Sequence, residues 1–155
     1  MIKKNYIPTI NISTIYKYGL DSKKSLKILE EIEKACTKVG FFKIIVHGIR
    51  QNDIKKITKV GNRFFNLKSE KKFKLAPRKW NKKNKNLYRG YFPNDVNGKE
   101  GLDIGDLKVS RKYALKIKNK YIEYLNLNKT LDKKSITTLS NYFDKIFNIG
   151  ECLFK

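Results

Sequence analysis

Few residues of this sequence could carry out chemistry, and histidine is the scarcest of them. The 155 residues include a single histidine, His47, which is followed by Gly48 and Ile49. A catalytic or metal-binding histidine needs partner side chains at a defined spacing, and no Ser-His-Asp set, Cys-Cys zinc spacing or glycine-rich phosphate loop occurs. Asp103 and Asp106 lie in the turn LDIGD, which lacks the further oxygen ligands of a calcium loop. We therefore expect a structural, hydrogen-bonded His47 and an acidic pair that belongs to a turn.

The net charge is the one extreme value of the composition. It is +22, from 36 Lys and Arg against 14 Asp and Glu. Such a charge fits a nucleic-acid or polyanion binding module in which Trp80 and the lysines of residues 78–85 form the contact surface. Only five of the basic residues are arginines, the residue best shaped for bidentate phosphate contacts, and Lys, Asn and Ile share A/T-rich codons. We favour a solvated lysine surface with Trp80 packed on the domain, and nucleic-acid or polyanion binding is the alternative.

The length and the termini predict a soluble protein. A chain of this length can bury a hydrophobic core of its own. Cys36 and Cys152 lie far apart, and no N-terminal apolar run of signal-peptide length and no run of about 20 apolar residues is present. We expect a reduced, cytoplasmic protein with no membrane partner.

The element that organises the chain is the apolar run GFFKIIVHGI at residues 40–49. Its continuous aromatic and β-branched residues predict a central strand buried on both faces. Residues 21–39 carry apolar side chains at helical spacing, at Leu26, Leu29, Ile32, Cys36 and Val39. The helix can be capped by Asp21 or Ser22 and ended by a left-handed Gly40. With an earlier strand at residues 7–12, this order predicts a crossover between parallel strands, with residues 14–20 as a loop before the helix.

The rest of the chain reads as two further helices separated by extended and irregular segments. Apolar residues from Ile54 to Phe65 recur at helical spacing, and Gly61 inside that helix suggests a close packing contact. Residues 76–86 predict an exposed loop, residues 121–132 a loop with local turns, and residues 107–117 fit either a strand or a helix. Ser135 is expected to cap a last helix whose apolar side runs to the end of the chain.

Five segments in order give the chain a resemblance to a known family. They are IPTINIS, GFFKIIVHGI, RFFNL, SEKK and YRGYFP. This series resembles the N-terminal region of the non-haem iron, 2-oxoglutarate-dependent oxygenases of the isopenicillin N synthase type. The resemblance covers nearly all of the chain but only the first half of such an enzyme. It implies an α+β fold, with helices packed on a few strands that would flank a double-stranded β-helix (jelly roll), the jelly roll itself being absent.

The resemblance also implies a chemistry whose central residues are missing. Family members hold iron with a His-x-Asp pair and a distant second His, and grip 2-oxoglutarate with Arg-x-Ser, and none of these occurs here. We expect no cofactor to be bindable by this chain, with iron and 2-oxoglutarate implied for the full-length family. By resemblance, Tyr88, Arg89 and Tyr91 are candidates for contact with the small-molecule substrate. The competing interpretation makes the tyrosines packing residues and pairs Arg89 with a neighbouring acid.

These observations predict a division of the chain and a function. Residues 1–134 are expected to form the dioxygenase-like region, and residues 135–155 a helix that would lead into a missing catalytic domain. We expect the N-terminal half of an oxygenase that catalyses hydroxylation, cyclisation or desaturation of a small molecule, inactive alone. The alternatives are a basic polyanion-binding module and a protein that binds a partner, such as the missing catalytic half, through the apolar stripe of its last helix at Phe143 and Phe147.

Overall fold

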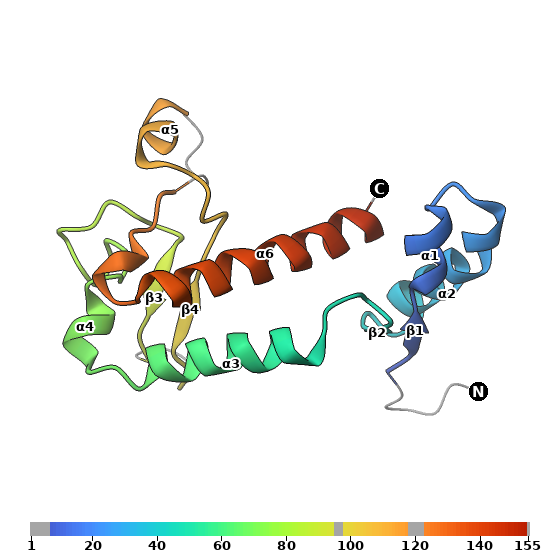
Figure 1. The fold of residues 1–155 in the computed structure, drawn as a ribbon, viewed down its shortest axis with the longest axis horizontal. Coiled ribbons are helices and arrows are strands. Elements are labelled where there is room, and N and C mark those ends of the chain that lie inside the picture. The colour runs from blue at the N-terminus through green and yellow to red at the C-terminus, as the bar shows by residue number, and fades with distance from the viewer. Residues whose placement is uncertain (1–6, 95–97, 118–122, 155) are drawn as a thin grey trace. The chain divides into compact units, whose positions relative to one another are not determined.

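The computed structural model describes residues 7–94, 98–117 and 123–154 of the chain (Figure 1). Helices predominate among these residues, together with two short two-stranded sheets. The predicted mixture of helices and strands is therefore confirmed. In chain order the elements are β1 (Thr9–Asn11), α1 (Ser13–Tyr18), the 3-10 helix η1 (Lys23–Ser25), α2 (Leu26–Lys38), β2 (Lys43–Ile45), α3 (Gln51–Phe65), α4 (Ser69–Phe73), β3 (Gly90–Phe92), β4 (Gly101–Asp103), α5 (Arg111–Lys116), the 3-10 helix η2 (Leu127–Lys129) and α6 (Lys133–Leu153).

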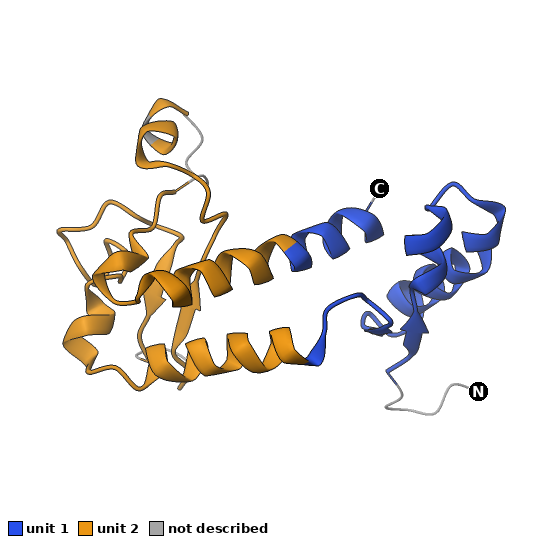
Figure 2. Cartoon of the chain, viewed as in Figure 1, with its two compact units in different colours: residues 1–51, 145–155 blue, residues 52–144 orange. Residues whose placement is uncertain are grey.

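The chain divides into two compact units, which Figure 2 colours separately. Unit 1 comprises residues 1–51 and 145–155, and unit 2 comprises residues 52–144. Each unit has its own cluster of buried apolar side chains. The division expected between residues 134 and 135 concerns family regions rather than compact units, and it stays a prediction.

The strand, helix, strand order predicted for the first part of the chain is confirmed. β1 and β2 pair in parallel, with Ile10 opposite Ile44. Ser22 Oγ accepts a hydrogen bond from the Lys24 backbone N–H at 3.3 Å and so caps the helical segment. After α2, Gly40 has φ +83°, the left-handed conformation that ends helices and that glycine adopts without strain.

The prediction that β2 is buried on both faces is wrong for this structure. Phe41 is 72% exposed, Ile45 46% and Val46 57%. Among the described residues β2 has β1 as its only strand neighbour, so the opposite edge of β2 is unpaired. Of residues 41–46, only Phe42 and Ile44 pack against the core of unit 1. The buried members of that core are Ile10, Ile12, Ile15, Ala35 and Ile149.

Two further expectations for unit 1 are wrong or only partly right. Most of the segment 14–20, predicted as a loop, forms the short helix α1, because Ile15 is fully buried and anchors it to the core. On α2 the predicted face is only partly right: Leu29 and Ile32 pack against the core as expected. Leu26 and Cys36 are exposed, and Ala35 is the buried residue of the helix.

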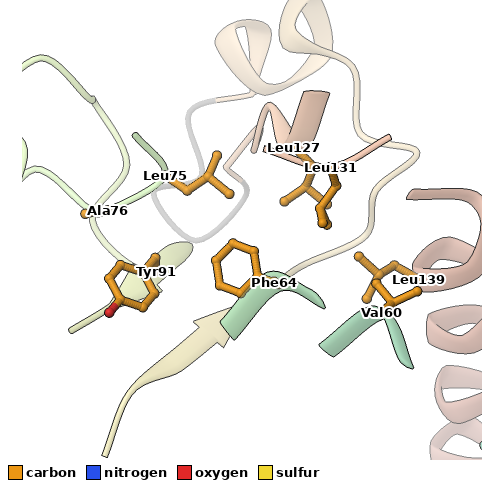
Figure 3. Packing of buried hydrophobic residues seen from close by; sticks show 8 residues of the cluster. All are labelled: Val60, Phe64, Leu75, Ala76, Tyr91, Leu127, Leu131 and Leu139. Carbon is orange, nitrogen blue, oxygen red and sulfur yellow. The ribbon is translucent and has the colours of Figure 1, made fainter. Parts of the chain in front are cut away.

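The core of unit 2 forms where α3 meets segments that follow it in the chain (Figure 3). The predicted apolar face of α3 buries Val60 and Phe64. The Phe64 ring packs edge-to-face on the Tyr91 ring, with the centroids 5.9 Å apart. The buried members of this cluster are Val60, Phe64, Leu75, Ala76, Tyr91, Leu127, Leu131 and Leu139. Gly61 makes no close contact, since a Cβ placed there would meet nothing within 4 Å, and the packing contact predicted for it is wrong.

Trp80 packs on the core of unit 2, as we expected in preference to stacking on a ligand. Its ring lies edge-to-face on Phe92 with the centroids 5.4 Å apart, and it borders the buried cluster. Lys79 Nζ lies 4.5 Å from the centroid of the Trp80 ring, within the range of a cation–π contact. The tryptophan therefore anchors the 76–86 loop to the domain.

The last helix begins two residues earlier than predicted. Asp132 Oδ1 accepts a hydrogen bond from the Ser135 backbone N–H at 2.8 Å, and Ser135 Oγ donates to Asp132 Oδ2 at 3.1 Å. Asp132 therefore caps α6, and the predicted cap at Ser135 is wrong because that serine lies within the first turn. These two hydrogen bonds hold the pKa of the Asp132 carboxyl below its usual range. Across the described part of the chain, neither α6 nor any other helix is long and apolar enough to cross a membrane.

Candidate functional site

The three predicted substrate-contact residues lie at the start of β3, where the backbone is held tightly. Gly90 has φ +130°, and a Cβ on it would overlap the carbonyl oxygen of Leu75. The Tyr91 backbone N–H donates to this same Leu75 carbonyl at 3.1 Å. Only glycine allows so close an approach of two backbones. Gly90 therefore fixes the backbone positions from which the side chains of Arg89 and Tyr91 extend.

A carboxylate from a distant segment binds the backbone just before Gly90. Glu123 accepts hydrogen bonds from three successive backbone N–H groups, of Leu87 at 2.6 Å, Tyr88 at 3.0 Å and Arg89 at 2.8 Å. Consecutive N–H groups that converge on one anion form a backbone nest. Glu123 thus orients the segment that carries Tyr88 and Arg89. No pattern in the sequence points to Glu123, because it lies in a stretch without periodicity.

Arg89 is half-buried beside Gly105. A Cβ built on Gly105 would lie 3.0 Å from Arg89 Nε, so the glycine leaves room for the guanidinium. Among the described residues no carboxylate forms an ion pair with Arg89, and the neighbouring acid of the competing interpretation is not found there.

Tyr88 and Tyr91 differ in their surroundings. Tyr88 is 40% exposed, whereas Tyr91 is 4% exposed in the core of unit 2. The Tyr91 hydroxyl donates to Glu100 Oε2 at 2.7 Å, and the Tyr91 ring packs edge-to-face on Phe64 and Phe73. In this structure Tyr91 is a packing residue, and substrate contact by Tyr88 and Arg89 stays a prediction.

Glu100 joins Tyr91 to a buried lysine. Lys72 Nζ lies 2.6 Å from Glu100 Oε2 and donates to the Phe65 carbonyl oxygen at 3.0 Å. The hydrogen bonds from Lys72 and then Tyr91 hold the pKa of Glu100 below its usual range. Burial, followed by the hydrogen bond to Glu100, raises the pKa of Tyr91 to about 12. The three side chains form a charged network that holds α4, β3 and the segment before β4 together.

The residues of this chain do not fit an iron centre. His47 is the sole histidine of the sequence, and its Nδ1 accepts a hydrogen bond from the Ile49 backbone N–H at 3.2 Å. This is the structural role predicted for it in the turn after β2. Within residues 7–94, 98–117 and 123–154, no group of three His, Cys, Asp or Glu side chains could hold a metal ion. An iron with two histidine ligands and one carboxylate ligand cannot be assembled from this sequence.

Comparisons with known proteins agree on one region of one class of enzyme. Residues 7–141 match the family described as "non-haem dioxygenase in morphine synthesis N-terminal". A probable iron/ascorbate oxidoreductase of Dictyostelium discoideum is 32% identical over an alignment of 172 residues. The alignment covers 96% of this chain and 44% of the relative. A 2-oxoglutarate-dependent dioxygenase of Talaromyces stipitatus is 36% identical over 56% of this chain and 26% of its own length. Isopenicillin N synthase of Amycolatopsis lactamdurans is 32% identical over 63% of this chain and 28% of its own length. The chain therefore spans less than half the length of these curated relatives.

Proposed function

We propose, from the premise that this chain belongs to the non-haem dioxygenase N-terminal family, that it is the N-terminal half of an iron- and 2-oxoglutarate-dependent oxygenase. The complete enzyme would hydroxylate, cyclise or desaturate a small molecule. The observation that carries the proposal is the family match over residues 7–141, together with relatives that are named as oxygenases. When bound to a complete enzyme, iron and 2-oxoglutarate would supply the oxidising chemistry.

The part of the work that this chain would do is structural support and substrate recognition. The outer edge of β2 is unpaired among the described residues, and Phe41, Ile45 and Val46 expose apolar surface beside it. A sheet edge flanked by exposed apolar side chains fits the addition of further strands. We assign this edge to the catalytic half of the enzyme, whose jelly-roll sheet β1 and β2 would extend.

Arg89 is the residue we assign to substrate recognition. Its backbone is held by Glu123, its side chain lies against Gly105, and no described acid pairs with it. An arginine presented in this way can bind a substrate carboxylate through two parallel hydrogen bonds. Tyr88 lies next to it with a partly exposed ring and would add an apolar face with a hydroxyl tip.

The first test asks whether the 155-residue chain is active without a catalytic half. We expect the 155-residue chain, supplied with ferrous iron, 2-oxoglutarate and oxygen, to release no succinate above a protein-free control. Succinate release by the chain alone would contradict the proposal. The coding nucleic acid beyond the Lys155 codon should also be sequenced. A continuation with His-x-Asp, a distant His and Arg-x-Ser would support the proposal, and a confirmed stop with no neighbouring catalytic half would contradict it.

The second test addresses Arg89 in the joined enzyme. Replacing Arg89 by Gln should raise KM for a carboxylate substrate by about tenfold to a hundredfold with a smaller change in kcat, since a charged binding contact is lost. Arg78→Gln is the matched control, because Arg78 is an exposed arginine of the 76–86 loop. Equal effects of the two substitutions on KM would refute the role of Arg89 without touching the family assignment.

A further inference from the structure

A hollow of about 390 Å³ lies in unit 2. Its walls come from residues 74–75, 83–86, 123–126 and 129, with the first turn of α5 at one side. This volume is within the range of small-ligand sites in proteins. The basic side chains that line the hollow are Lys74, Lys83, Lys85, Arg111 and Lys129.

Hydrogen bonds from asparagine side chains hold the walls of the hollow. Asn84 Nδ2 donates to the Lys74 carbonyl at 3.0 Å and to the Ala76 carbonyl at 2.7 Å. Asn86 Nδ2 donates to the Tyr124 carbonyl at 3.0 Å. The loop that carries Lys83 and Lys85 is therefore fixed to both neighbouring segments, and the lysines converge on the hollow from a defined backbone.

The positive charge around the hollow is only partly balanced by acids. None of the five basic side chains forms an ion pair with a described residue. Glu123 also lines the hollow; its carboxylate is held by three backbone hydrogen bonds from residues 87–89 and offsets one of the five positive charges. The basic side chains repel one another across a small volume, and a bound anion would remove this repulsion.

We propose that this hollow binds a phosphate-bearing ligand with several negative charges. Lysine binds phosphate as a point charge, and four lysines and an arginine suit an oligophosphate better than a single carboxylate. All five basic residues are exposed, so the ligand can reach them. The phosphates can come from a free oligophosphate or nucleotide, or from the backbone of a single-stranded nucleic acid. This site goes beyond the proposed oxygenase function and does not depend on it.

The test compares two triple variants that remove the same charge from the 155-residue chain. The site variant is K83Q/K85Q/K129Q. The control variant is K55Q/K56Q/K59Q, which changes exposed lysines of α3 that do not line the hollow. Both lower the net charge by three, so a general attraction of anions to the basic surface weakens equally in both.

Binding of inorganic tripolyphosphate and of a short oligothymidylate is measured by isothermal titration at several salt concentrations. We expect the site variant to bind tripolyphosphate about tenfold more weakly, since three exposed ion pairs are lost, and the control variant to bind within about twofold of the wild type. For the oligothymidylate, loss of three phosphate contacts lowers the salt slope by about 2. Equal weakening by both variants, or no binding of either probe at low salt, would overturn the proposal.

One further measurement tests the site without any variant. Lysine acetylation followed by mass spectrometry should show Lys83, Lys85 and Lys129 protected by tripolyphosphate in the wild-type chain, with Lys55 and Lys59 unprotected. Uniform protection, or none, would contradict the site without any variant. If the site lysines are needed for both probes, the probe with the tighter binding at physiological salt identifies the source of the phosphates, and either result supports the site.

Discussion

Replacing Lys72 and replacing Glu100, the two partners of one ion pair, should destabilise unit 2 by different amounts. The Lys72 side chain is 9% exposed and that of Glu100 is 31% exposed. Removing one partner of a buried ion pair costs about 3–5 kcal/mol, because the remaining charge is left without compensation. Lys72→Met leaves the better solvated Glu100, which keeps the Tyr91 hydroxyl and gains water. Glu100→Ala leaves the buried ammonium with the Phe65 carbonyl and the Tyr91 ring, whose centroid lies 5.3 Å from Nζ.

These exposures decide the order of the two effects. We expect a loss of unfolding free energy of about 2 kcal/mol for Lys72→Met and about 3 kcal/mol for Glu100→Ala. The double variant leaves no stranded charge, so it should lose about 2 kcal/mol, which is about 3 kcal/mol less than the sum of the single losses.

Urea unfolding followed by tryptophan fluorescence measures these losses in unit 2, because Trp80 is the single tryptophan and lies in that unit. Additive losses would refute the ion pair as a coupled element. A larger loss for Lys72→Met than for Glu100→Ala would refute the argument from exposure.

Two other predictions concern the same region. Tyr91→Phe should cost about 2 kcal/mol at neutral pH, since a hydrogen bond to a carboxylate is lost. The pKa of Tyr91 in the folded protein is raised from 10.0 to about 12. The stabilisation by its hydrogen bond is therefore present below pH 10 and is lost as the pH rises toward 12. If urea titrations give the same stability difference between the wild type and the variant across this pH range, the prediction is contradicted. Gly90→Ala should cost about 4 kcal/mol or prevent folding, because its Cβ would overlap the Leu75 carbonyl. The control is Gly61→Ala within α3. It should stabilise the folded protein by about 1 kcal/mol, because nothing lies within 4 Å of the added carbon. Similar urea midpoints for the two glycine variants would refute both predictions.

Local patterns in the sequence predicted local structure well. The spacing of apolar residues placed α3, and the order of strand, helix and strand predicted the parallel pairing of β1 with β2. The first depends on residues close in the chain, whose periodicity records which side is buried. The second depends on the rule that a strand, a helix and a strand in succession form a crossover between parallel strands. The left-handed Gly40 was predictable because glycine commonly ends a helix.

Polar contacts between distant segments were not predictable. Glu123 binds backbone groups 34 to 36 residues away, and Lys72 binds Glu100 across 28 residues. A single charged side chain forms no periodic pattern, and the residues around it in the sequence do not indicate which residue it contacts. The site residues Tyr88, Arg89 and Tyr91 came from a family resemblance, and only the packing around them separates the buried Tyr91 from the exposed Tyr88.

The exposed apolar surface beside β2 bears on the proposed function. Residues 40–49 have the composition of a strand buried on both faces, yet Phe41 and Val46 are more than half exposed. Exposed aromatic and β-branched side chains beside an unpaired strand edge favour aggregation in a monomer. The chain covers 44% or less of its relatives. We infer that the composition of this strand is suited to a larger sheet, in which the catalytic half supplies the next strand and covers Phe41. In that assembly β2 would be the central strand that its sequence predicts.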